Sequence, residues 1–187
     1  MRFDTDDGTG TKLSAGNVDP AMRDRAVEAG GKVTGPMVDM DTAAMFDFTA
    51  AGEPVHPGPV GVIGYCLGGR LALLAAGYHP ERVRASASLH GAVLVTDDDD
   101  SAHLMADRIE GEFYFGYAEK DPFASPEVRA TLEKVMTPAG VDYRYCFHEG
   151  IDHGYALPER DIHDRHAAAR DWENIFAMFR RQMPPGG

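Results

Sequence analysis

The chain has 187 residues, which predicts one domain, and 43% of them are apolar, which is enough for a hydrophobic core. The formal net charge of -12 argues against nucleic acid and anionic membranes as partners, and no apolar stretch is long enough to cross a bilayer. The first residues are polar and acidic and do not resemble a secretion signal. Because the only cysteines are Cys66 and Cys146, we expect a reducing, cytoplasmic setting.

The first part of the chain is predicted to be irregular or helical. Residues 1–18 are rich in Gly, Thr and Asp without periodicity, which is typical of a loop. A proline-led start and a closing glycine pair favour a short helix near 20–29. We therefore treat 1–35 as a poorly defined segment with one short helix and 36–187 as the folded domain. A second helix is expected over 36–51, where apolar residues recur at helical spacing: Met37, Met40, Ala44, Phe48 and Ala51.

From residue 59 onward, strand and helix patterns alternate, which predicts a mostly parallel sheet flanked by helices. The expected strands are 60–65, 83–89, 112–117 and 142–147. The expected helices are 67–78, a short one near 101–107, one that opens at Ser125 and ends near 137, and a final one over about 160–182. An aromatic stripe on the final helix is expected to face the core: Trp172, Phe176 and Phe179.

The most informative motif is Gly64-Tyr65-Cys66-Leu67-Gly68, between an apolar strand and an alanine-rich helix. It has the G-x-S-x-G spacing of a nucleophile elbow, with Cys66 in the place of serine. Glycine at both flanking positions leaves room for a nucleophile on a strained turn. The N-terminus of the following helix favours the thiolate of Cys66, and the Leu67 N–H is the expected oxyanion donor. Taken alone, the motif fits a buried structural cysteine equally well.

Two further loops at predicted strand ends carry matching chemistry. Asp121 follows the strand 112–117, and His153 follows the strand 142–147. The order nucleophile, acid, histidine is the chain order of α/β-hydrolases. His153 is expected to accept the thiol proton, and Asp121 to orient the imidazole. Glu119 is an alternative acid, and His148 is an alternative base that fits a packing role better.

The motifs Gly64-Tyr65-Cys66-Leu67-Gly68-Gly69, Asp121 and His153-Gly154-Tyr155-Ala156 together resemble the dienelactone hydrolase family of α/β-hydrolases. The resemblance extends from about residue 36 to the C-terminus. It implies a partial α/β-hydrolase fold and a triad of Cys66, His153 and Asp121. It also implies cleavage of a small ester or lactone through a cysteine thioester, without a metal or an organic cofactor.

The resemblance also shows where this chain departs from the family. Family members begin with further strands and with a loop that gives a second oxyanion donor, and the sequence before Val60 has no room for them. We therefore expect an N-terminally shortened form of the fold. Dienelactone-cleaving members place an arginine for the substrate carboxylate after the histidine. Leu157 matches that position here, so the substrate need not be a dienelactone.

A shortened fold would leave the strand 60–65 as an apolar edge, which favours self-association. The alternative hypothesis is thus a catalytically silent domain that acts by pairing with a partner. A weaker one makes Cys66 a redox-sensing thiol. The other conspicuous side chains are given structural interpretations: a solvated acidic loop at Asp97–Asp100, a surface ion pair for Arg70, a buried small residue for Cys146, and no completed metal site at His163, Asp164 and His166.

Overall fold

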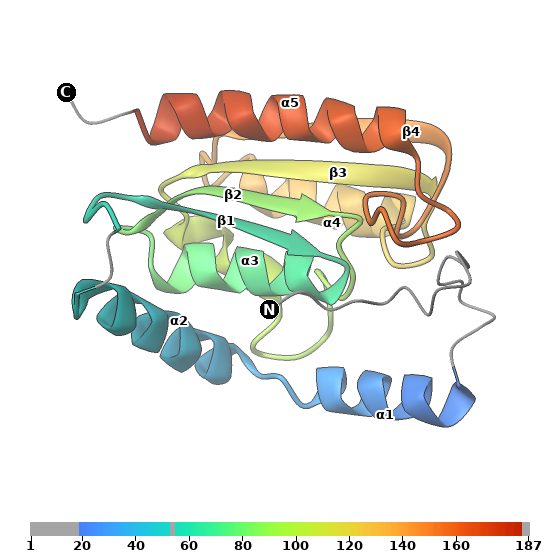
Figure 1. Cartoon of the computed structure of the whole chain (residues 1–187), viewed down its shortest axis with the longest axis horizontal. Coiled ribbons are helices and arrows are strands. Elements are labelled where there is room, and N and C mark those ends of the chain that lie inside the picture. Colours follow the sequence, from blue (N-terminus) through green and yellow to red (C-terminus); the bar gives the residue numbers. More distant parts are fainter. Residues whose placement is uncertain (1–18, 53–54, 185–187) are drawn as a thin grey trace.

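The computed structural model describes residues 19–52 and 55–184, so the loop predicted over 1–18 lies outside the described residues (Figure 1). The centre of the fold is a sheet of four parallel strands that lie side by side in chain order. This confirms the predicted parallel sheet flanked by helices. The strands are β1 (Val60–Tyr65), β2 (Val83–Leu89), β3 (Glu112–Lys120) and β4 (Tyr143–Asp152).

Helices cover both faces of the sheet (Figure 1). One face carries α3 (Leu67–Tyr78), a short 3-10 helix (Ala102–Arg108) and α4 (Pro126–Met136). The opposite face carries α5 (Arg165–Gln182). The first two helices, α1 (Pro20–Gly31) and α2 (Gly35–Ala50), form an outer layer beyond α3. Among the described helices, none is long and apolar enough to cross a membrane.

The sheet divides the apolar core into two clusters, as the two-residue period of a strand requires. In β3, Phe113 and Phe115 pack on the side of α3 and α4, whereas Tyr114 between them packs on the side of α5. Leu73 and Leu74 of α3 are fully buried in the first cluster. The C-terminal strand ends therefore stand on a sheet that is fixed from both sides.

Two predicted apolar stripes agree only in part with the packing. In α5, Trp172 and Phe179 are partly buried and pack against the core as predicted. Phe176 is 51% exposed, because the most buried face of this helix runs through Asp171, Ile175 and Met178. The helix also begins later than predicted, at Arg165, because the Asp164 carboxylate caps it. In α2, the predicted apolar residues Met37, Met40 and Phe48 are exposed, and Val38 and Phe46 contact the core instead.

Candidate active site

Cys66 occupies the turn between β1 and α3 with a positive φ of 52°. This conformation is strained for a residue with a side chain. Backbone hydrogen bonds hold it: the Cys66 N–H donates to Leu89 O (3.1 Å), and the N–H groups of Gly69 and Ala92 both donate to Cys66 O (2.9 Å each). The turn is thus fixed by the end of β2 and by the helix that follows.

The two glycines of the motif are not equivalent. A Cβ atom on Gly64 would lie 1.8 Å from the carbonyl oxygen of Gly68, which no side chain can accommodate. A Cβ atom on Gly68 would meet nothing within 4 Å. The steric requirement predicted for both positions is therefore confirmed for Gly64 and wrong for Gly68.

His153 and Asp121 meet across the ends of β3 and β4. His153 Nδ1 is hydrogen-bonded to Asp121 Oδ2 at 2.9 Å. The other carboxylate oxygen of Asp121 accepts the N–H of Phe123 at 2.9 Å, and the whole residue is 6% exposed. The carboxylate is therefore held in one orientation, and the proton of a neutral His153 is placed on Nδ1. This tautomer leaves Nε2 free to act as a base.

Cys66 lies beside His153. The hydrogen bond with His153 lowers the pKa of the Cys66 thiol, with the Leu67 N–H acting in the same direction against the effect of burial. Burial alone would lower the pKa of His153, but the hydrogen bonds with Asp121 and Cys66 raise it to about 9. The two shifts together favour a thiolate beside an imidazolium.

The structure thus joins His153 to Asp121 by a hydrogen bond and places Cys66 close enough to His153 and to the Leu67 N–H for both to lower its pKa. The alternative acid, Glu119, is exposed and accepts the N–H of Gly150 at 2.7 Å instead.

Arg70 departs from the predicted surface ion pair. It is 6% exposed, donates to Val33 O at 2.8 Å and lies 3.7 Å from the Asp100 carboxylate. It therefore ties the start of α3 to the segment before α2 and to the acidic loop. The prediction of a pair at the surface was wrong, because the guanidinium lies beneath these two segments.

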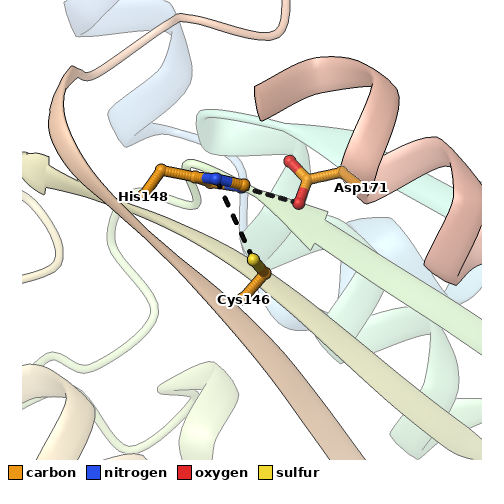
Figure 2. Close-up of side chains that lie close together, drawn as sticks. All are labelled: Cys146, His148 and Asp171. Atoms are coloured by element: carbon orange, nitrogen blue, oxygen red, sulfur yellow. Dashed lines mark hydrogen bonds and ion pairs between the residues drawn. The ribbon is translucent and has the colours of Figure 1, made fainter. Parts of the chain in front are cut away.

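The alternative base, His148, lies apart from Cys66, His153 and Asp121. Figure 2 shows it between Cys146 and Asp171, with its Nε2 2.8 Å from Asp171 Oδ1 and its Nδ1 3.9 Å from Cys146 Sγ. Cys146, predicted as a buried small residue, is half-buried and packs against the α5 side of the core. Asp171, which sequence reasoning did not single out, is fully buried in α5.

Sequence reasoning also missed the neighbour of the His153 ring. His90, at the end of β2, is fully buried, and its ring centroid lies 4.9 Å from that of His153. The ring of Phe123 flanks His153 at 5.0 Å as a second aromatic contact. Neither ring nitrogen of His90 has a hydrogen-bond partner among the described residues. The available signal was the histidine itself, directly after the predicted strand 83–89.

The model of the dienelactone hydrolase family matches residues 12–183. The chain belongs to this family. Among curated relatives, "Protein usf" of Aquifex pyrophilus is 29% identical over 78% of this chain and 61% of its own length. The carboxymethylenebutenolidase of Rhodococcus opacus is 30% identical over 67% of this chain and 51% of its own length. The chain thus spans about three fifths or less of these two relatives.

Solved structures of the dienelactone hydrolase family share the fold. A Klebsiella pneumoniae protein described as a candidate dienelactone hydrolase matches 80% of this chain and 62% of its own, with a TM-score of 0.72 and 19% identity. The dienelactone hydrolase-like promiscuous phosphotriesterase P91, from metagenomic libraries, matches 91% of this chain and 69% of its own, with a TM-score of 0.65 and 18% identity. At these identities the likeness establishes a partial α/β-hydrolase fold.

The glycine geometry predicts opposite results for two alanine substitutions in one motif. Gly64→Ala should lower the free energy of unfolding by more than about 3 kcal/mol, because the added Cβ meets backbone that cannot move away. Gly68→Ala, the matched control, should change it by less than about 1 kcal/mol. Urea unfolding of both variants tests this, and equal losses would contradict the steric account.

Burial of His90 predicts an acid-sensitive contribution to stability. Burial, followed by the nearby His153, lowers the pKa of His90 from 6.5 to about 4. The unfolded chain then binds more protons than the folded one between these values, so stability falls as pH drops from about 6.5 to 4, by roughly 3 kcal/mol. His90→Phe should remove that part of the pH dependence. Unfolding measured from pH 7 to 4 tests it, and parallel curves for both proteins would refute it.

Proposed function

We propose that this chain is a hydrolase that cleaves a small ester or lactone through a thioester on Cys66. The observation that carries the proposal is the hydrogen bond between His153 and Asp121, beside a Cys66 thiol whose pKa His153 lowers. These three residues suit nucleophilic catalysis: Cys66 supplies an activated sulfur, His153 a base that can become an acid, and Asp121 a carboxylate that fixes the ring. Membership of the dienelactone hydrolase family supports the same reaction class.

Acylation begins with attack of the Cys66 thiolate on the carbonyl carbon of the substrate. The new C–S bond pushes the carbonyl electrons onto oxygen, and the Leu67 N–H donates to this oxyanion. When the oxyanion collapses, the C–O bond to the leaving alcohol breaks. The His153 imidazolium gives its proton to the departing alkoxide, which in a lactone remains attached to the acyl chain.

Deacylation reverses the proton movements. Neutral His153 takes a proton from water as the water oxygen attacks the thioester carbonyl carbon. The second oxyanion forms beside the same Leu67 N–H, the C–S bond breaks, and the carboxylic acid product leaves Cys66 as a thiolate beside the imidazolium. Asp121 stays ionised throughout and keeps Nε2 aimed at the sulfur.

A catalytically silent domain that acts by pairing with a partner is the second candidate. It is favoured by the position of β1, which pairs with β2 alone among the described strands although it carries the nucleophile turn. An unpaired strand edge is a site of association. The two candidates differ in turnover, which the first of the following experiments measures.

One prediction tests the proposed triad and separates Asp121 from the alternative acid Glu119. Cys66→Ala should reduce kcat for a small activated aryl ester by about 1,000-fold or more, and Asp121→Asn by about 100-fold or more. Glu119→Gln, the matched control for the acid, should stay within about two-fold, because Glu119 is bonded to Gly150 instead. Undiminished turnover in Cys66→Ala, or none in the native chain, would sink the proposed reaction.

The second prediction concerns pH. The thiolate–imidazolium pair exists between the lowered pKa of Cys66 and the pKa of His153 at about 9. The dependence of kcat/KM on pH should therefore be bell-shaped, falling above about 9 as His153 loses the proton that the leaving group needs. In Asp121→Asn the upper limb should move to lower pH, because a bond that raises the His153 pKa is weakened. An upper limb that stays at the same pH in Asp121→Asn would show that the titration of His153 does not control the reaction.

A further inference from the structure

A second cysteine and histidine meet on β4, under α5 and outside the proposed triad (Figure 2). Cys146, His148 and Asp171 each offer one ligand atom, and these atoms all lie within 4.8 Å of one another. The cluster does no work in the proposed hydrolysis, since His148 makes its hydrogen bond with Asp171. The question is what a thiol, an imidazole and a buried carboxylate do at this place.

Asp171 is fixed as an acceptor. It is fully buried, and its two carboxylate oxygens accept the hydroxyl protons of Tyr114 (2.8 Å) and Tyr155. The oxygen that accepts from Tyr114 also lies 2.8 Å from His148 Nε2. With three hydrogen-bond partners on its two oxygens, Asp171 serves to orient His148.

This orientation decides which nitrogen of His148 is free. Because Nε2 faces a carboxylate, the proton of the neutral ring belongs on Nε2, and the Nδ1 lone pair is left exposed to Cys146. Metal-bound histidines in proteins show this pattern: one nitrogen binds the ion and the other donates to a carboxylate. Asp171 therefore prepares His148 as a ligand through Nδ1.

The spacing of the two free donors suits a thiophilic ion. Cys146 Sγ and His148 Nδ1 are 3.9 Å apart, which is long for a hydrogen bond of a thiol. Zinc bonds of about 2.3 Å to sulfur and about 2.0–2.1 Å to nitrogen place two tetrahedral ligands about 3.6 Å apart. A shift of a few tenths of an ångström would thus close the site around an ion.

The surroundings offer a way in. His148 lines a cavity of about 400 Å³ at the end of β4, whose other polar lining residues are Glu149, Asp164, His166 and Arg170. The two carboxylates of this lining, Glu149 and Asp164, outnumber its one guanidinium, Arg170, and the net charge of the chain of -12 also attracts cations. Since Cys146 and His148 supply two ligands, the remaining positions of an ion would be filled by water.

We propose that Cys146 and His148 form a binding site for a thiophilic divalent metal ion of the Zn²⁺ class, with Asp171 as the positioning residue that orients His148. The site is independent of the proposed hydrolase reaction. An ion bound there would link β4 to the polar network around Asp171 and would stabilise the fold in proportion to its occupancy.

The test uses Co²⁺ as a spectroscopic probe in Cys66→Ser protein that has been freed of metal, so that Cys146 is the remaining thiol. We expect one equivalent of Co²⁺ to give a thiolate-to-cobalt charge-transfer band that Zn²⁺ abolishes. Adding Cys146→Ser should remove the band, and adding His148→Phe should weaken binding at least ten-fold. Adding Asp171→Asn should weaken it by about 10–100-fold. Adding His56→Phe, at an exposed histidine, should leave it unchanged.

Two outcomes would overturn the proposal. One is the absence of a charge-transfer band in folded Cys66→Ser protein, a result that does not depend on whether any further variant folds. The other is a band and an affinity that survive Cys146→Ser. Co²⁺ binding without a thiolate band is a case of the first outcome and would assign the ion to surface carboxylates. Far-UV circular dichroism of each variant, recorded before titration, confirms that a lost band reflects a lost ligand.

Discussion

The hydrogen bond between His153 Nδ1 and Asp121 Oδ2 determines what the rest of the site can do. It joins the loops that follow β3 and β4, fixes the tautomer of the imidazole and turns Nε2 towards Cys66. It also helps to raise the pKa of His153 to about 9, which favours a protonated ring beside the Cys66 thiolate. Without this hydrogen bond, Cys66 would differ little from Cys146, the other half-buried free cysteine.

The loop that carries His153 is itself held by the polar network under α5. Tyr155, two residues further on, is fully buried, and its hydroxyl donates to Asp171. The carbonyl oxygen of Tyr155 accepts the N–H of Asp164, and its ring lies 5.4 Å from that of His90. Contacts on the α5 side of the sheet thus hold the loop that carries the His153 imidazole. The same buried carboxylate orients His148 for the proposed metal site.

The sequence predicted the elements whose signals are local. The bounds of β1, β2 and α3 agree with their predicted ranges, because a short apolar run, a strict alternation and a glycine-rich turn mark them directly. Cys66, Asp121 and His153 were predicted from residue type and from position after strands, since parallel strands bring their C-terminal ends to one edge. The long end of β4, up to Asp152, was not predicted, because its pairing with Lys120 is a tertiary contact.

What the sequence could not indicate depends on contacts between distant segments. His90 and Asp171 are polar residues in apolar surroundings, and nothing near them in the chain shows that they meet His153 and His148. The burial of Ile175 and the exposure of Phe176 in α5 likewise depend on how this helix packs on the sheet. Periodicity predicts that a helix has an apolar side, but tertiary packing determines which residues on that side are buried.

The most direct test of the central claim is mass spectrometry of the chain during turnover of a slowly deacylating activated ester. The account predicts a transient increase in mass equal to the acyl group, which maps to the peptide containing Cys66 and decays as free acid appears. Hydrolysis that proceeds with no adduct, or with a kinetically competent adduct on Cys146, would contradict it.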